Sequence, residues 1–430
     1  MSSDTIFALA TGAGRAAVAV IRMSGRKAGE VLDGLCRRPA SRQATLRLLR
    51  HDGAALDQAL VLWFPAPASY TGEDCAELQL HGGPAVVAAV ADALVTLGAR
   101  PAEPGEFTRR AFVHGKMDLT AAEGIADLID AETEAQRRQA LRQAGGALAA
   151  RHAEWAAQLT RLLARQEAFI EFEAEDLPAG LDEAVAREAA ALRDALAAEI
   201  AEGSRGEALR EGLRIAILGA PNAGKSSLLN ALAGRDAAIV SPQAGTTRDV
   251  VQVRLVLAGV PVTLSDTAGL RVSCDAIEAE GVRRARAEGS AADLVIAVFA
   301  ADAEPDWETL ALVEAGALKV MNKADLATAP IAGLAVSALT GAGLPALRAA
   351  LEARVTAKAG PGQAAALTRP RHRAALADAV AALDEVAYAP LPEIAAEALR
   401  TALLALGRLT GAVGTEAILD LVFSEFCIGK

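Results

Sequence analysis

The sequence predicts a multidomain protein of mixed α/β and all-α character, and three observations support this fold class. Short β-like runs alternate with turns in residues 1–117, which suggests a small α+β domain. Helical texture fills residues 118–211 and returns in 359–430. Between them, residues 212–358 alternate apolar strands with helices, as a parallel sheet covered on both faces does. The simplest inference is an α/β domain inserted into one helical domain.

The N-terminal region contains three strand-like runs and one helix-like run. Residues 16–25, 58–65 and 75–83 are rich in apolar residues and end at Gly or Pro, as strands commonly do. Residues 83–99 have helical spacing and end near a glycine. These patterns predict an α+β fold for residues 1–117.

The helical regions carry their own boundary signals. Thr120 and Glu123 match a capping box before the amphipathic stretch 120–172, and "GSRG" at 203–206 predicts a break. Residues 357–363 resemble a linker, and the basic cluster 368–373 is interpreted as the start of the second helical stretch. An amphipathic helix is expected over 416–426, and it would hold the C-terminal end in place.

Composition narrows the class of protein. The chain has 430 residues, a net charge of −11 and a pI near 5.2, which argues against a general nucleic-acid coat but leaves room for a local basic patch. The four cysteines form no CxxC pair, so neither a zinc ribbon nor a disulfide framework is indicated. With no signal-peptide pattern and no apolar run of about 18 residues, we expect a soluble, cytoplasmic protein without membrane segments.

Residues 219–226, "GAPNAGKS", match the pattern G-x-x-x-x-G-K-[ST] between an expected strand and an expected helix. Glycines allow the backbone to curl so that N–H groups and the helix N-terminus face phosphate oxygens. Lys225 would neutralise the β- and γ-phosphates, and the Ser226 hydroxyl would bind Mg²⁺. The contacts expected from this loop are Asn222, Ala223, Gly224, Lys225, Ser226 and Ser227.

Further motifs follow at the ends of later strands and identify the nucleotide as GTP. "DTAG" at 266–269 would lie near Mg²⁺ and the γ-phosphate, and Asp325 of "NKAD" would accept hydrogen bonds from guanine. "SAL" at 337–339 fits the last base-contacting loop, and "GTTRD" at 245–249 supplies Thr247 for Mg²⁺. The additional contacts are Asp266, Thr267, Ala268, Gly269, Asn322, Lys323, Ala324, Asp325, Ser337, Ala338 and Leu339. Together the motifs predict a Ras-like P-loop GTPase domain.

Two details concern the chemistry of hydrolysis. Asn222 is similar to the asparagine of GTPases that bind K⁺ between the α- and γ-phosphates, although its alternative is an ordinary turn residue. The other K⁺ ligands and nucleotide contacts would come from Ser241, Pro242, Gln243, Ala244, Gly245, Thr246 and Thr247, with Ser241, Gln243 and Thr246 nearest the ion. Leu270 stands where many GTPases have glutamine, so Glu278 is the candidate for orienting water; its alternative is a solvated helix start.

Several blocks resemble one family along essentially the whole chain. They are "GAPNAGKSSLLNALAGRDAAIVSPQAGTTRDV", "SDTAGLR", "SYTGEDCAELQLHGGP", "PGEFTRRAFVHGKMDLTAAEGIADLIDA" and the terminal "FCIGK". These blocks resemble the tRNA modification GTPase family MnmE, also called TrmE. The GTPase motifs alone would not separate this family from ribosome-assembly GTPases, whereas the N-terminal blocks and the tail do.

The resemblance implies a homodimer whose N-terminal domain binds 5-formyltetrahydrofolate or a related tetrahydrofolate. It implies a helical domain interrupted by the GTPase domain, with hydrolysis activated by K⁺-dependent pairing of two GTPase domains. With a flavoprotein partner, MnmG, in a heterotetramer, the family adds an aminomethyl or carboxymethylaminomethyl group to C5 of the wobble uridine, position 34, of certain tRNAs.

The resemblance also implies roles for particular residues. Arg22, Glu77, Lys116 and Lys430 become candidates for the folate site, and Glu278 becomes the catalytic base. Cys427 would be a thiol directed at the chemistry, with a structural thiol as the alternative. The chain departs from the family at "TGAG" (11–14), at His114 where asparagine is frequent, and in a short stretch between Asp302 and Lys319.

Two other functions stay open at this point. A GTPase switch in ribosome assembly would need neither the tail nor the folate-domain motifs. A one-carbon enzyme acting alone would need a flavin or nicotinamide fingerprint, and the sequence has none.

Overall fold

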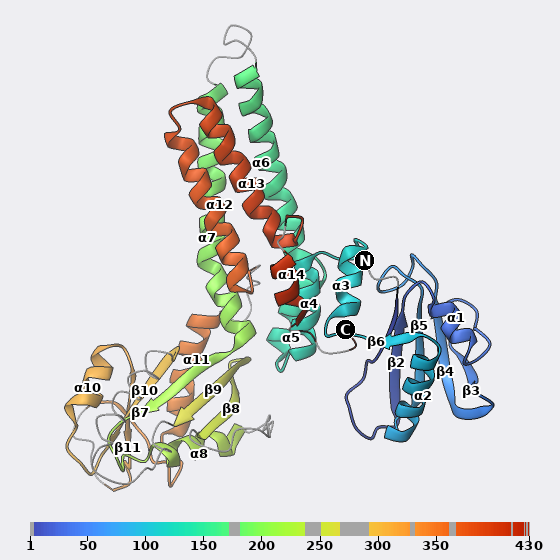
Figure 1. Ribbon diagram of the computed structural model, residues 1–430. Helices are drawn as coiled ribbons and strands as arrows, with labels where there is room; N and C mark the ends of the chain where they lie inside the picture. Colours follow the sequence, from blue (N-terminus) through green and yellow to red (C-terminus); the bar gives the residue numbers. More distant parts are fainter. Residues whose placement is uncertain are drawn as a thin grey trace, which may run out of the picture. The chain divides into compact units, whose positions relative to one another are not determined.

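The structure is a computed structural model, and it describes residues 4–171, 181–236, 251–266, 292–326, 332–360, 367–413, 416–424, 426 and 429 (Figure 1). The chain divides into two compact units, each described here by itself. The first unit comprises residues 1–126, 143–173 and 392–430, and the second comprises 127–142 and 174–391. Within the described ranges, no helix has the length and apolar character needed to cross a membrane.

The first unit contains a six-stranded sheet in the order β3-β4-β5-β2-β1-β6. Its strands are β1 (Thr5–Leu9), β2 (Val18–Ser24), β3 (Thr45–His51), β4 (Ala54–Phe64), β5 (Cys75–His81) and β6 (Ala99–Pro101). Neighbouring strands are antiparallel except for the parallel pair β1 and β6. The strands expected over 16–25, 58–65 and 75–83 are confirmed as β2, β4 and β5.

Two helices, α1 (Ala28–Asp33) and α2 (Pro84–Thr96), complete the core of this α+β fold. Apolar side chains of both helices pack with every second residue of the central strands, so one face of the sheet is buried. The helix expected over 83–99 is therefore confirmed as α2. The sequence interpretation missed β1, β3 and β6, of which β6 has only three residues.

The remaining helices of the first unit include α3 (Glu106–Val113), most of α4 (Leu119–Asp130), α6 (Ala147–Glu171) and α13 (Pro392–Thr410). The Gln166 side chain of α6 donates to the Pro392 carbonyl at 3.2 Å, which ties the start of α13 to α6. The capping box expected at Thr120 is wrong. Asp118 caps α4 instead, because its Oδ1 accepts from the Ala121 N–H at 2.7 Å.

The described residues near the C-terminus are packed. Helix α14 (Glu416–Ser424) confirms the helix expected there, and the Phe423 ring lies 6.2 Å from Phe112 of α3. Phe426 is buried. Gly429 has φ +101°, and a Cβ added to it would lie 2.5 Å from the Leu9 carbonyl oxygen. Only glycine fits this contact. Gly429 is thus held against strand β1.

The second unit contains another six-stranded sheet, in the order β12-β11-β10-β7-β9-β8. Its strands are β7 (Leu213–Leu218), β8 (Val251–Leu257), β9 (Val260–Asp266), β10 (Leu294–Ala300), β11 (Leu318–Asn322) and β12 (Leu334–Ala335). All neighbours are parallel except β8 and β9, which are antiparallel. The expected parallel sheet is confirmed, with β8 as an unpredicted antiparallel edge.

Helices cover both faces of this sheet, as expected. Side chains of β10 alternate: Ile296 and Val298 pack with α8 (Lys225–Asp236) and α11 (Leu344–Ala359), whereas Ala297 and Phe299 pack with α10 (Trp307–Glu314). Strand β7 lies between β9 and β10, so the chain order changes direction there. The carboxyl ends beside such a reversal form the usual ligand crevice of an open α/β sheet.

The second unit also holds α7 (Leu181–Glu211), α12 (Pro370–Tyr388) and most of α5 (Glu134–Ala144). The break expected at 203–206 is wrong, because α7 continues through it. At Gly203 a Cβ would lie 2.8 Å from Leu367 Cδ1, so this glycine permits close packing rather than ending the helix. The basic cluster 368–373 does begin a helix, since α12 starts at Pro370.

Candidate functional site

The loop of residues 219–224 joins β7 to α8 at the carboxyl end of the sheet (Figure 1). Gly219 and Gly224 have φ of +154° and +85°, and a Cβ at either position would collide with Val298 O or Asn322 Nδ2. Asn222 also adopts a left-handed conformation, with φ +62°, and it is exposed. The curled backbone and the N-terminus of α8 form the geometry that binds phosphate.

Lys225 lies inside this loop. Its Nζ donates to the carbonyls of Gly219 and Ala220, both at 2.9 Å, and the residue is 7% exposed. Burial lowers the pKa of the Lys225 ammonium, with Asp266 and Asp306 opposing that shift. A desolvated cation held by weak carbonyl ligands favours a phosphate oxygen as an additional partner.

Ser226 and Asp266 lie together, as the motifs require of a magnesium site. The Ser226 hydroxyl, at the start of α8, donates to Asp266 Oδ2 at the end of β9. Asp266 is 1% exposed, so its carboxylate is shielded from bulk water. A hydroxyl is an oxygen donor that suits Mg²⁺, and a buried carboxylate beside it can accept hydrogen bonds from water on such an ion.

Asn322 connects the phosphate loop with the loop expected to contact the base. Its Nδ2 donates to Ala223 O at 2.9 Å, and its Oδ1 accepts from the Ala338 N–H at 3.1 Å. Lys323, with φ +62°, binds Asp302 at 3.1 Å, while Asp325 is exposed. The structure therefore brings the expected residues of these three loops to one end of the sheet.

Several predicted residues lie outside the described ranges. They are Ser241, Pro242, Gln243, Ala244, Gly245, Thr246, Thr247, Thr267, Ala268, Gly269, Glu278, Cys427 and Lys430.

A cavity of about 420 Å³ in the first unit is lined by all three folate candidates within the described part, Arg22, Glu77 and Lys116. Arg22 on β2 faces Glu77 on β5, and its Nε and Nη2 donate to Glu77 Oε1 at 3.0 and 2.9 Å. The Arg22 guanidinium also lies 5.1 Å from the Tyr70 ring centroid. Lys116 Nζ donates to the Pro67 carbonyl at 3.1 Å.

The cavity also contains residues that sequence reasoning did not single out. They are Arg42, Phe64, Ala68, Ser69, Tyr70 and Cys75. Tyr70 and Cys75 lie within the block "SYTGEDC", so that motif could have indicated them as site residues. Arg42 lies in a stretch that matches no motif. The cavity thus combines two aromatic rings, three cations and one carboxylate.

Comparison with known families gives the chain's relationship. A family model described as GTP-binding protein TrmE N-terminus matches residues 5–116, and one described as MnmE helical domain matches residues 119–427. This chain belongs to the MnmE (TrmE) family. A tRNA modification GTPase MnmE from Gluconacetobacter diazotrophicus is 58% identical, over 99% of this chain and 98% of that protein. The protein of the same name from Granulibacter bethesdensis is 55% identical over the full length of both.

The G domain of the T. maritima FeoB iron transporter is 25% identical and covers 34% of this chain and 98% of that chain, with a TM-score of 0.25. The fold of the second unit follows from its strand order.

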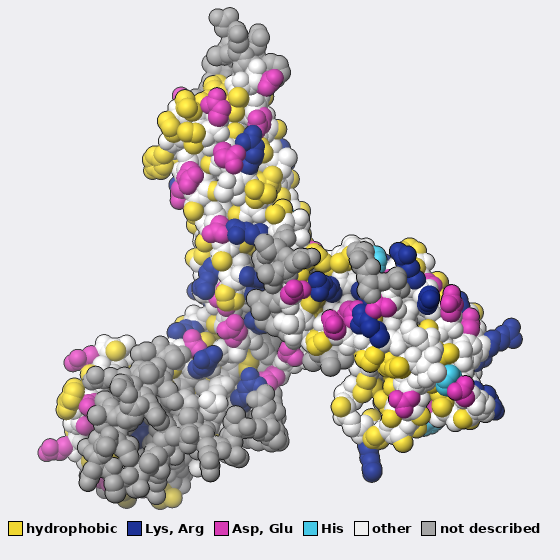
Figure 2. Space-filling view, in the orientation of Figure 1, with side chains coloured by type: hydrophobic (Ala, Val, Ile, Leu, Met, Phe, Trp, Pro, Cys, Tyr) yellow, Lys and Arg dark blue, Asp and Glu magenta, His cyan; other side chains and the backbone are white. Residues whose placement is uncertain are grey.

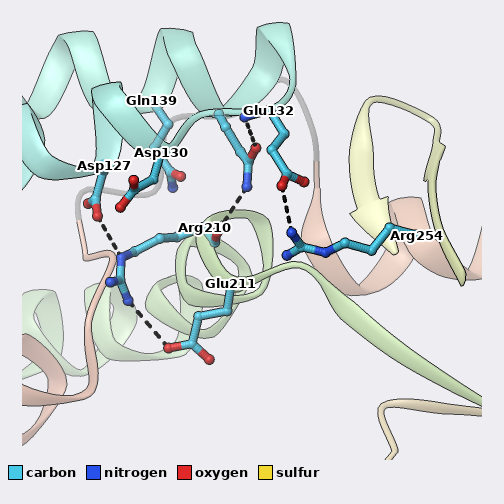
Figure 3. Close-up of a pocket in the computed structure, with 8 residues that line it drawn as sticks. Asp127, Asp130, Glu132, Gln139, Arg210, Glu211 and Arg254 are labelled. Carbon is cyan, nitrogen blue, oxygen red and sulfur yellow. Dashed lines mark hydrogen bonds and ion pairs between the residues drawn. The ribbon is translucent and has the colours of Figure 1, made fainter. Parts of the chain in front are cut away.

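The second unit of this MnmE-family chain contains another cavity, of about 370 Å³, which the sequence did not predict (Figure 3). Its lining residues are Asp127, Asp130, Glu132, Gln136, Gln139, Arg210, Glu211 and Arg254. Asp127 accepts from Arg210 at 2.8 Å, and Glu132 binds Arg254 of β8 at 2.6 Å. Gln136 donates to the Arg210 carbonyl at 2.9 Å. Polar bonds therefore join the segment 127–142 to α7 and to the nucleotide sheet.

Proposed function

We propose that this chain is a K⁺-dependent GTPase that modifies the wobble uridine, position 34, of certain tRNAs with a flavoprotein partner resembling MnmG. The product would carry an aminomethyl or carboxymethylaminomethyl group at C5. Family membership makes the chain a GTP hydrolase of tRNA modification. The GTP-hydrolysing part of this proposal is supported most directly by Lys225, Ser226 and Asn322, which lie together at the carboxyl end of the sheet.

The hydrolytic role follows from the chemistry of these side chains. Lys225 and the loop N–H groups would bind the phosphates, and Ser226 with Thr247 would hold Mg²⁺. Asp325 would accept the guanine N1–H and N2–H₂, which adenine lacks as a pair. Mg²⁺ and K⁺ would supply positive charge against the phosphate oxygens.

Hydrolysis itself would need a group outside the described ranges. Glu278 would orient the attacking water, and Asn222 would be a K⁺ ligand together with backbone groups around Ser241, Gln243 and Thr246. The exposure of Asn222 beside the phosphate loop agrees with a role toward an ion.

The N-terminal cavity suits a reduced folate. Arg22 donates to Oε1 of Glu77, and among the described residues no side chain donates to Oε2, so Oε2 could accept from the donor edge of a pterin. Lys116 can neutralise a carboxylate of the folate tail, and Tyr70 and Phe64 provide ring faces. In this proposal Lys430 joins the same site, and Cys427 is directed toward its chemistry.

The proposed organisation comprises an N-terminal dimerisation and folate domain (1–117) and a helical domain in two parts (118–211 and 359–430). A GTPase domain (212–358) is inserted between these parts. We further propose a homodimer that forms a heterotetramer with the flavoprotein partner and acts in the cytoplasm.

Nucleoside analysis of tRNA tests this function. Deleting the gene from its native host should remove the C5 modification at position 34, and expressing the chain should restore it. A strain without the gene whose wobble uridines stay fully modified would contradict the proposal. The same result with a ribosome-assembly defect would favour a GTPase switch instead.

A further inference from the structure

A basic stretch stands out within an acidic chain. Residues 26–50 contain seven Lys or Arg and two Asp or Glu, a net charge of +5, whereas the whole chain has a net charge of −11. None of the residues named for the nucleotide site lies in this stretch. This local excess of positive charge lies next to a ligand cavity, and it would attract a negatively charged partner.

Four of these residues lie at one edge of the N-terminal sheet, and we call Arg37, Arg38, Arg42 and Arg47 the arginine edge. Arg47 of the edge strand β3 donates to the Arg37 carbonyl at 2.9 Å. The Arg38 guanidinium lies 4.6 Å from the Trp63 ring centroid, and the Arg42 N–H donates to the Trp63 carbonyl at 2.8 Å. All four residues are therefore tied to the same end of β3 and β4.

Most of this positive charge is not neutralised within the described part of the chain. Only Arg38 forms an ion pair there, with Asp33. Arg42 donates to the Ala68 carbonyl, and Arg47 donates to the carbonyls of Arg37 and Leu46. Carbonyl bonds fix a guanidinium without cancelling its charge, so the remaining N–H groups can bind phosphate in their forked geometry.

The arginine edge is continuous with the folate-type cavity. Arg42 belongs to both, because it lines the cavity with Arg22 and Lys116 and lies 5.8 Å from the Phe64 ring. Figure 2 shows Lys and Arg side chains projecting from the outer edge of this domain, where α1 and β3 lie in Figure 1. A polyanion bound along the edge would be led to the cavity.

We propose that the arginine edge binds the phosphate backbone of the tRNA substrate beside the cavity. The proposal rests on the proposed function, which makes tRNA the substrate. RNA is favoured over an acidic protein partner because the edge offers separate guanidinium groups at the surface, with Arg37 and Arg42 exposed, and phosphates repeat along a strand as separate charges. Elsewhere the acidic balance of the chain would repel RNA.

The test uses the full chain and unmodified tRNA. The double variant Arg37→Ala/Arg47→Ala should bind tRNA roughly tenfold more weakly at 100 mM KCl. The slope of log K against log salt should fall in magnitude by about 1.5, because two phosphate contacts are lost. Arg37→Lys/Arg47→Lys should keep most of that slope, since it keeps both charges.

A matched control removes two arginines elsewhere. Arg137→Ala/Arg138→Ala changes the charge equally at exposed positions of α5, where both arginines pair with Glu134, and it should bind tRNA as the unchanged chain does. GTP hydrolysis without tRNA and folate binding should be the same in all three variants. Thermal unfolding checks that Arg47, which bonds two carbonyls, is not needed for folding.

The outcomes separate this inference from the proposed function. If Arg37→Ala/Arg47→Ala binds tRNA with unchanged affinity and salt slope while modification persists, the inference fails and the function stands. If that variant keeps tRNA binding but no longer captures the flavoprotein partner, the edge is a protein-binding surface and the inference also fails. Loss of tRNA binding with the expected change in slope supports it.

Discussion

Replacing Asn322 with alanine should detach the phosphate loop from the base-contacting loop. Asn322 is 2% exposed, and its Nδ2 donates to Ala223 O at 2.9 Å and to Gly224 O at 3.4 Å, while its Oδ1 accepts from the Ala338 N–H at 3.1 Å. Leaving a buried donor or acceptor without a partner costs about 1–3 kcal/mol each. Because Ala223 is buried and Ala338 half-buried, we expect a total near 3 kcal/mol.

The free energy lost in Asn322→Ala should appear in two measurements on the full chain. Urea unfolding followed at the second unit should show a lower free energy of unfolding, and a fluorescent GDP analogue should bind at least tenfold more weakly, which is about 1.4 kcal/mol of the total. The reasoning would be refuted if the free energy of unfolding of Asn322→Ala lay within about 0.5 kcal/mol of that of the unchanged chain and its GDP affinity lay within twofold.

Two further variants locate the cause. Asn322→Asp keeps the acceptor for Ala338 but turns the donor that faces Ala223 O into a second acceptor, so it should be no better than alanine. Lys323→Ala removes an ion pair to Asp302 at 30% and 37% side-chain exposure, and it should cost under about 1 kcal/mol of folding stability.

Three other predictions concern candidate site residues, and a fourth concerns Glu106 at the start of α3. Asn222→Ala should abolish the faster GTP hydrolysis in K⁺ over Na⁺ buffer, and equal rates of the unchanged chain in both salts would count against a K⁺ site. Glu278→Ala should keep GTP binding and lose about 10²-fold in hydrolysis rate; normal turnover would reassign the water-orienting role. Cys427→Ser should keep GTP hydrolysis and lose tRNA modification, whereas full modification would return the thiol to a structural role. Burial raises the pKa of Glu106, but bonds from Arg100, the Glu103 N–H and Arg110 outweigh it and hold the pKa below 4.5; the stability that the charged carboxylate contributes is therefore present above about pH 4.5 and lost below it. Acid unfolding of the first unit should show this loss, and Arg100→Met should make the pH profile flatter there.

The nucleotide site was predictable because its motifs are local and its sheet is parallel. Each motif follows an apolar run, and the carboxyl ends of β7, β9 and β11 meet at one edge, so chain order alone placed Lys225, Asp266 and Asn322 together. The N-terminal cavity was different. Arg22 and Glu77 lie 55 positions apart and face each other only through the pairing of β2 with β5. Composition would have left both as surface charges.

The errors have a common physical origin, which is packing that no local pattern reveals. Gly203 signals a break in sequence, yet α7 needs it because Leu367 lies against that turn. Thr120 and Glu123 fit a capping box, yet both are fully buried and Asp118 provides the cap. In each case a residue that commonly marks a helix boundary lies buried inside a helix instead.

The segment 127–142 shows the same limit on a larger scale. In sequence it lies within a continuous helical stretch, yet it belongs to the compact unit of the nucleotide sheet. Asp127 explains this, because its Oδ1 accepts from Arg210 at 2.8 Å and from Arg369 at 2.9 Å. Arg210 lies just before β7, and Arg369 lies just before α12, so the Asp127 carboxylate binds the chain at both ends of the sequence that forms the sheet. Arg210 and Arg369 lie 159 positions apart, and no sequence pattern links them. They hold the segment in place because both bind the largely buried Asp127 carboxylate.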